Sequence, residues 1–159
     1  MDWTALEDVA PEIAELGRDR LDRARVALLA TLRSDGWPRV SPIEPYFSQG
    51  LLLFGAMTWS LKALDLRRDP RCTLHSAVTG PDSGEGELKL YGRAAEVDEA
   101  VRSSCEGGWW LDKAPETATV FGLSIERAAF VGWDIGGAQM EVRSWSPEHG
   151  YTSTHRRYP

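Results

Sequence analysis

The sequence lacks the features that mark several large classes of protein. No apolar run approaches the ~20 residues that a membrane-spanning helix needs, and the first residues do not have the basic and then apolar build of a secretory signal. The two cysteines, Cys72 and Cys105, form no CxxC motif and are too few for a disulfide framework. His75, His149 and His155 show no metal-ligand spacing with a cysteine or carboxylate pair. These absences predict a reduced, cytoplasmic protein that has no membrane anchor and binds no metal.

Positive charge is also in deficit. The 159-residue chain has 18 Lys and Arg against 24 Asp and Glu, which gives a formal net charge of −6. Because duplex binding needs a basic surface, this balance predicts that nucleic acid is not the partner. Lysine is especially scarce, at positions 62, 89 and 113 alone, and the excess of arginine is typical of a high-GC genome. A hydrophobic fraction of 42% and a charged fraction of 26% are ordinary for one globular domain spanning residues 1–159.

Hydrophobic spacing predicts the order of the elements. Leu6, Val9, Ile13 and Leu16 recur at helical spacing, so residues 4–16 are expected to form a helix that ends near Gly17. This helix belongs to an N-terminal helical segment, and short strands with a few helices follow it. The expected segments are helical 1–25, strands 26–32, 39–47 and 51–57, helix 60–68, strands 72–78 and 87–97, helix 98–106, strands 126–135 and 139–147, and a polar, extended tail 148–159. Residues 79–86 read as a flexible glycine-rich loop, and residues 107–120 have no readable pattern.

Tight turns between neighbouring strands set the fold class. Six or seven short strands without parallel βαβ order predict a mainly β protein, with an antiparallel sheet closed into a small barrel and helices beside it. The glycine-rich motifs of Rossmann and P-loop proteins and the GxSxG motif of hydrolases do not occur. Pro42 and Pro45 fall within strand 39–47, which predicts an edge or a bulge there, because proline donates no ladder hydrogen bond.

A helix start with hydroxyls and a cation is the strongest local signal of a ligand site. Strand 51–57 leads into Thr58-Trp59-Ser60-Leu61-Lys62, and helix 60–68 ends at Asp69-Pro70. The hydroxyl of Thr58 or Ser60 can cap the helix, while its free N–H groups can instead hold a phosphate to which Lys62 adds charge. The pattern alone leaves both readings open.

The order of elements around this helix start is similar to that of one family. Residues 27–97, with their Asp-Gly turn, proline-interrupted strand and S-x-K helix start, resemble the pyridoxamine 5'-phosphate oxidase-like family of flavin-binding split barrels. The resemblance implies a homodimer of six-stranded antiparallel split barrels with a cofactor in a cleft between subunits. In that family an S-R-K-A motif grips the cofactor phosphate, and Ser60, Lys62 and Ala63 match it. Leu61 stands where the motif has arginine, and the resemblance places it with Ser60 and Lys62 among the predicted cofactor-binding residues.

The same resemblance implies which other residues lie along the cofactor. Residues at the end of strand 51–57 would line the ribityl chain and ring, strand 39–47 would lie along the ring, and a tryptophan of the last strand would reach the partner subunit's cofactor. The matching positions are Ala56, Met57, Thr58, Arg39, Ser41, Ile43 and Trp145. Structural alternatives stay open for several of them: Arg39 can be a solvated strand residue, Met57 a core residue and Trp145 a packing residue at the dimer interface. Trp109 and Trp110 could cover a pocket or seal that interface.

The resemblance favours an oxidoreductase that uses FMN or the deazaflavin coenzyme F420 on an unknown small-molecule substrate. The cofactor carries the hydride chemistry in such enzymes, so no catalytic acid or base is assigned. The high-GC composition and Leu61 favour F420. A true pyridoxamine 5'-phosphate oxidase is disfavoured, because the R-x-H segment expected soon after Trp145 does not occur. A third alternative is a non-catalytic flavin- or haem-binding protein, in which His75 or His155 would serve as the haem ligand.

Overall fold

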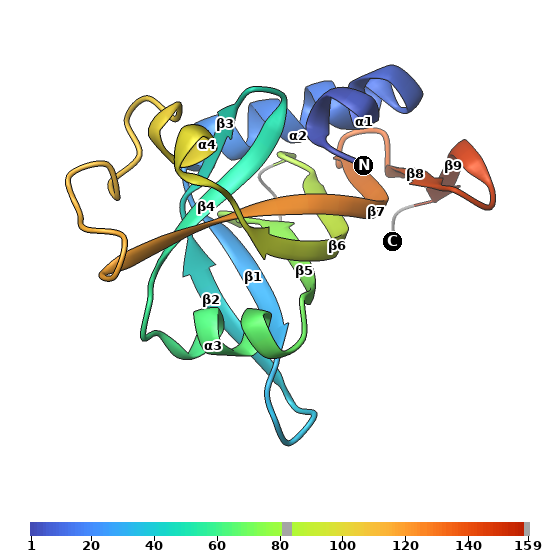
Figure 1. Cartoon of the computed structure of the whole chain (residues 1–159). Helices are drawn as coiled ribbons and strands as arrows, with labels where there is room; N and C mark the ends of the chain where they lie inside the picture. Colours follow the sequence, from blue (N-terminus) through green and yellow to red (C-terminus); the bar gives the residue numbers. More distant parts are fainter. Residues whose placement is uncertain (81–83, 158–159) are drawn as a thin grey trace.

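The computed structural model describes residues 1–80 and 84–157 as an antiparallel β structure with helices packed beside it (Figure 1). None of the described helices is long and apolar enough to cross a membrane. The described residues form four helices and nine strands. These are α1 (Trp3–Val9), α2 (Pro11–Ala24), β1 (Ala27–Leu32), β2 (Pro38–Ile43), β3 (Pro45–Ser48), β4 (Leu51–Met57), α3 (Leu61–Arg68), β5 (Arg71–Ser76), β6 (Glu87–Glu96), α4 (Glu99–Ser103), β7 (Ala118–Asp134), β8 (Gln139–Ser146) and β9 (Gly150–Arg157).

The barrel is closed by the chain itself at Glu44. Strands pair antiparallel in the order β2-β1-β5-β6-β7-β4-β3, so the two ends of this order are consecutive in the sequence. Ile43 of β2 pairs with Ala27 of β1, and Pro45 of β3 pairs with Phe54 of β4. When β2 and β3 are counted as one segment, the order becomes a ring of six strands. In the described part of the chain β2 and β4 do not pair, which leaves the barrel split between them. The predicted mainly β split barrel is confirmed.

The expected single strand over 39–47 is therefore wrong in one respect. It is two strands that hydrogen-bond to different neighbours, with Glu44 between them. Pro42 and Pro45 flank this residue, and neither can donate a ladder hydrogen bond. The prolines thus mark the place where the chain leaves the edge of β1 and joins the edge of β4.

Two helices cover one end of the barrel, and the break between them falls at Ala10, not at the predicted helix end near Gly17. The chain breaks at Ala10 (φ −148°, ψ 61°), and Pro11 starts α2, a position that suits proline because its missing N–H is not needed there. Gly17 lies inside α2 and does not end it. A Cβ at Gly17 would stand 2.8 Å from Cδ1 of Leu88, so the glycine lets α2 pack closely on β6. The helix ends at Ala24 and is capped by Arg25, whose backbone is left-handed (φ 57°).

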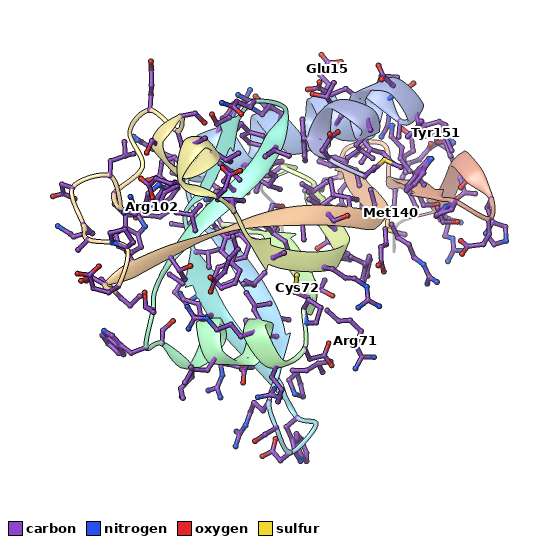
Figure 2. All side chains as sticks on the ribbon, in the orientation of Figure 1. Glu15, Arg71, Cys72, Arg102, Met140 and Tyr151 are labelled. Carbon is purple, nitrogen blue, oxygen red and sulfur yellow. The ribbon has the colours of Figure 1, made fainter. Side chains whose placement is uncertain are left out.

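The C-terminal third has more strand than the sequence predicted. β7 covers 17 residues because it pairs in turn with β4, β6 and β8, and its first part lies in the stretch 107–120 that had no readable pattern. The polar tail predicted over 148–159 forms β9, which pairs with β8 and carries Tyr151, labelled in Figure 2. The Tyr151 hydroxyl donates a hydrogen bond of 2.8 Å to Oε2 of Glu12 in α2. Residues 158–159 of that tail, and residues 81–83 of the predicted flexible loop 79–86, lie outside the described residues.

Apolar side chains form two buried clusters. The main core fills the barrel and the space under α1 and α2, with Leu6, Ile13, Leu29 and Leu88 among its fully buried members. A smaller core joins β4 and the start of β7 to the segment after α4; its members are Leu53, Cys105, Trp110, Ala118 and Val120. The second core holds the segment between β6 and β7 against the rim of the split.

Candidate functional site

The split between β2 and β4 opens into a cleft of about 470 Å³. This volume is typical of small-molecule and cofactor sites. One wall is the end of β2, the other is the end of β4, and the start of α3 lies at the base. The lining residues are Val26, Pro42, Ile43, Glu44, Gly55, Ala56, Met57, Ser60, Lys62 and Trp109.

The base of the cleft is the N-terminus of α3. Ser60 is the N-cap in an extended conformation (φ −66°, ψ 148°), and its Oγ accepts a hydrogen bond of 3.4 Å from the N–H of Ala63. The N–H groups of Leu61 and Lys62 belong to the first turn, where an α-helix offers them no acceptor. The helix dipole adds partial positive charge at the same place. The cleft therefore has a base that favours an anion.

Lys62 extends across the split. Its Nζ donates a hydrogen bond of 2.9 Å to the carbonyl oxygen of Pro42 on the opposite wall. Burial lowers the pKa of Lys62, and the carboxylate of Glu44 opposes that shift. A half-buried ammonium that has lost part of its solvation is stabilised by an anion brought close to it. Lys62 thus adds to the preference of the α3 N-terminus for an anion.

The turn before α3 is held by contacts that lead away from the cleft. The N–H of Thr58 donates to the carbonyl of Thr117 at 3.0 Å, and Nη1 of Arg67 donates to the carbonyl of Thr58 at 2.7 Å. Arg67 is itself fixed through Nε to Oε1 of Glu96 at 2.6 Å. Thr58 is accordingly an anchor of the turn, and it does not line the cleft.

Arg39 is bound to α3 of its own barrel. Its Nε donates to Oδ2 of Asp65 at 2.7 Å, and the hydroxyl of Thr31 donates to the same oxygen at 3.0 Å. Burial alone would raise the pKa of Asp65, but the hydrogen bonds from Arg39 and Thr31 outweigh it and lower that pKa. This cluster joins β1, β2 and α3 beside the cleft, and Arg39 does not line the cleft itself.

The structure brings five of the ten predicted site residues into the cleft. Ser41 is on β2 opposite Leu29, outside the lining, and Leu61 is 58% exposed on α3. Trp145 on β8 is only 8% exposed and packs in the main core of its own barrel. A contact between Trp145 and a partner subunit's cofactor stays a prediction. The five residues in the cleft are Ile43, Ala56, Met57, Ser60 and Lys62.

Gly55 and Trp109 also line the cleft. Gly55 was not among the predicted site residues, and for Trp109 a place over a pocket was one of two readings that the sequence left open. A Cβ at Gly55 would stand 2.5 Å from Cε3 of Trp110 and 2.9 Å from Cζ2 of Trp109, so both indoles lie directly on the backbone of β4. A glycine inside an apolar strand is a known signal of such close approach. The signal was present in residues 51–57, but it does not say which residue approaches.

Comparison with known proteins identifies the family. Residues 13–132 match the family model described as pyridoxamine 5'-phosphate oxidase. The chain belongs to this family. The matched region contains both strands of the split, the start of α3 and every residue that lines the cleft. No curated protein matches the sequence.

Solved structures share the fold across nearly the whole chain. A haem-binding protein from Mycobacterium smegmatis has a TM-score of 0.65 with 16% identity, covering 94% of this chain and 90% of its own. PhzG from Burkholderia lata, in complex with tetrahydrophenazine-1-carboxylic acid, has a TM-score of 0.64 with 14% identity over 98% and 88%. A pyridoxamine 5'-phosphate oxidase-related, FMN-binding protein from Nostoc punctiforme has a TM-score of 0.63 with 12% identity over 93% and 96%. At these identities the likeness establishes the fold.

Proposed function

We propose that the chain is a flavin- or deazaflavin-dependent oxidoreductase that binds FMN or coenzyme F420 in the cleft between β2 and β4 and acts on a small molecule. The observation that carries the proposal is the half-buried ammonium of Lys62 beside the first-turn N–H groups of α3, at the base of a cleft whose other lining residues are apolar apart from Ser60 and Glu44. Such a site matches a ligand with a phosphate at one end and a flat apolar ring at the other.

The predicted residues at the cleft divide into two sets. Ser60, Lys62 and the backbone of Leu61 would hold the phosphate, while Ile43, Ala56 and Met57 would lie along the ribityl chain and ring. The bound coenzyme supplies the hydride transfer, and the chain's own part is to bind it, orient it and exclude water. Arg39, Ser41, Thr58 and Trp145 stay outside the cleft lining, and for these four a direct cofactor contact is proposed on the resemblance alone.

We also propose that the protein acts as a homodimer. The outward faces of β1 and β2 place apolar side chains in the open: Leu28 pairs with Pro42 and Ala30 with Val40, and Val40 is 62% exposed. Pro42 also lines the cleft, so this face continues into the cleft mouth. A second copy is the occupant that would cover the apolar face and complete the cleft at once.

The non-catalytic alternative is weakest in its haem form. The Nδ1 of His75 lies 2.7 Å from the carbonyl of Ser76, and its Nε2 lies 3.1 Å from Oε2 of Glu87. With both ring nitrogens engaged, His75 offers no free lone pair to an iron. His155 is on the exposed strand β9, which pairs with β8 and contributes no residue to the cleft lining. A true pyridoxamine 5'-phosphate oxidase remains disfavoured, because the segment after Trp145 carries no R-x-H.

Both cysteines support the proposal of a reduced, cytoplasmic setting. Cys72 and Cys105 are buried and unpaired, and burial raises the pKa of the Cys72 thiol to about 12. Buried protonated thiols of this kind are packing residues, and neither is placed to act as a nucleophile in the cleft.

Titration of the purified protein with FMN and with F420 tests the proposed function. Coenzyme fluorescence is followed as protein is added, with riboflavin as the matched probe that lacks the phosphate. Saturable binding of FMN or F420, much tighter than that of riboflavin, is the expected result. Binding of neither coenzyme would overturn the proposal, and equal binding of FMN and riboflavin would overturn the phosphate role of the α3 start.

A further inference from the structure

Trp109 is the large aromatic side chain of the cleft, and none of the roles above accounts for it. It comes from the segment between α4 and β7, and it lines the cleft together with Gly55, Ala56 and Met57 of β4. Its edge rests on the backbone at Gly55, where a Cβ would stand 2.9 Å from Cζ2 and 3.0 Å from Cε2. The indole is thus in direct contact with the wall along which a ring would lie.

The neighbouring residue fixes this position. Trp110 is fully buried, and its Nε1 donates to the carbonyl of Arg102 at 3.2 Å. In return, Nη2 of Arg102, the residue labelled in Figure 2, donates to the carbonyl of Trp110 at 2.7 Å and to that of Lys113 at 2.6 Å. Tyr46 packs edge-on against Trp110 with 4.8 Å between ring centroids. These contacts anchor the segment, so the indole of Trp109 is held in place before any ligand arrives.

The position of Trp109 along β4 complements that of Lys62. Gly55 precedes Met57 by two residues, which corresponds to roughly 6–7 Å along a strand, and the α3 start follows Met57. The aromatic contact is therefore displaced from the cationic base along the same wall. A coenzyme whose phosphate sits at Lys62 would bring its ring toward Gly55 and Trp109. The lining of the same cleft includes the apolar side chains of Val26 and Ile43, together with the carboxylate of Glu44.

We infer that Trp109 is a ring-positioning residue that packs its indole against the isoalloxazine or deazaflavin ring of the coenzyme bound in the same protomer. This inference rests on the proposed function and assigns a further contact to it. Aromatic pairs are favoured beyond their buried area, so loss of the indole weakens binding even where an aliphatic side chain fills the space. The rigid support from Trp110 and Arg102 reduces the entropy that ordering such a contact would cost.

The test compares Trp109→Leu, Trp109→Phe and Trp37→Leu with the unmodified protein in the FMN and F420 titrations. Trp37 is 70% exposed on the β1–β2 turn, outside the cleft, and serves as the matched tryptophan control. An indole packed on the ring quenches coenzyme emission. The expected result is that Trp109→Leu weakens binding about fivefold and restores emission of the bound coenzyme. Trp109→Phe should keep most of the affinity but still restore emission, and Trp37→Leu should match the unmodified protein in both.

Each outcome bears on a different claim. If the unmodified protein binds neither coenzyme, the proposed function fails and this inference fails with it. If the coenzyme binds but Trp109→Leu and Trp109→Phe leave both the dissociation constant and the emission unchanged, the inference alone is overturned. Should Trp109→Leu not fold, as judged by circular dichroism, Trp109→Phe decides the question through the emission of the bound coenzyme.

Discussion

The Nζ of Lys62 donates a hydrogen bond to the carbonyl oxygen of Pro42 at 2.9 Å, and so joins the base of the cleft to the β2 wall beside the split, where β2 and β4 do not pair in the described part of the chain. Pro42 is the last but one residue of β2, and Lys62 is in the first turn of α3. The cation of the proposed phosphate site therefore also bridges the barrel at its open seam. A ligand phosphate would compete with the Pro42 carbonyl for this ammonium.

Replacement of Lys62 by alanine should weaken coenzyme binding by ~1.5–3 kcal/mol, because a charge-assisted hydrogen bond to phosphate is lost. The measurement is the dissociation constant for FMN or F420. Lys113→Ala is the matched control, since Lys113 is paired with Asp112 outside the cleft. An unchanged constant in Lys62→Ala would show that Lys62 makes no contact with the coenzyme.

Coenzyme affinity should also fall with rising pH earlier than an ordinary lysine would allow. Burial lowers the pKa of Lys62 from its usual 10.5, so the ammonium deprotonates at lower pH and its attraction for phosphate is lost there. Dissociation constants measured from pH 7 to 10 check this. Lys62→Arg keeps its charge throughout and should flatten the profile. A profile that is the same in both proteins would contradict the assignment.

Replacement of Asp65 by asparagine should destabilise the fold by about 1–3 kcal/mol, because Asp65 accepts hydrogen bonds from both Thr31 and Arg39. The lowered pKa of Asp65 means that its carboxylate stabilises the fold above the unfolded pKa of about 3.9. This contribution is lost as the pH falls through the folded value. Denaturant unfolding at pH 7 and at pH 3 should show a difference between the two proteins that shrinks at the acid end. A constant difference would mean that the charge of Asp65 is not what stabilises the cluster.

Gly55→Ala should cost about 1–3 kcal/mol of stability, because the added methyl group would overlap Trp110 at 2.5 Å and Trp109 at 2.9 Å. Thermal unfolding measures the effect, which corresponds to a fall in Tm of several degrees for a chain of this size. Gly80→Ala is the control, since nothing lies within 4 Å of a Cβ built there and its φ is not positive. Equal stability of the two variants would exclude the close packing of the indoles on β4.

A charge on the outer face of β2 should separate the subunits. Val40→Glu places a carboxylate on the proposed dimer face, whereas Val9→Glu places one on α1, where Val9 is similarly open to solvent. Light scattering after size exclusion should give a dimer for the unmodified protein and for Val9→Glu, and a monomer for Val40→Glu. A monomeric unmodified protein at micromolar concentration would refute the homodimer.

Local signals in the sequence predicted the elements that frame the cleft. Strand 51–57 and the Ser60-capped helix ending at Asp69 have the expected bounds, because apolar runs, caps and proline stops act within a few residues. Pro42 and Pro45 predicted an irregularity near Glu44. They could not predict that β2 and β3 pair with different strands, because that depends on strands that are distant in sequence. Ala10 and Pro11 split the first helix, although the hydrophobic spacing continues across them.

The positions of two tryptophans could not be predicted from the sequence. Trp109 lies in the cleft and Trp145 in the core, and neither position follows from local pattern, because each depends on which strands pair. Arg39 was expected beside the ring, yet the direction of its side chain depends on Asp65, which comes from a different element. Of the predicted residues that line the cleft, Ser60 and Lys62 were indicated by the helix-start pattern itself, whereas Ile43, Ala56 and Met57 were placed by the family resemblance.

The closure of the barrel through Glu44 also limits how the family scaffold can adapt in this chain. Since β2 and β3 are covalently continuous, the two rims of the seam cannot drift apart without bending the backbone at one residue. The width of the seam therefore depends on the backbone angles at Glu44, whereas its chemistry depends on the side chains that line the two rims.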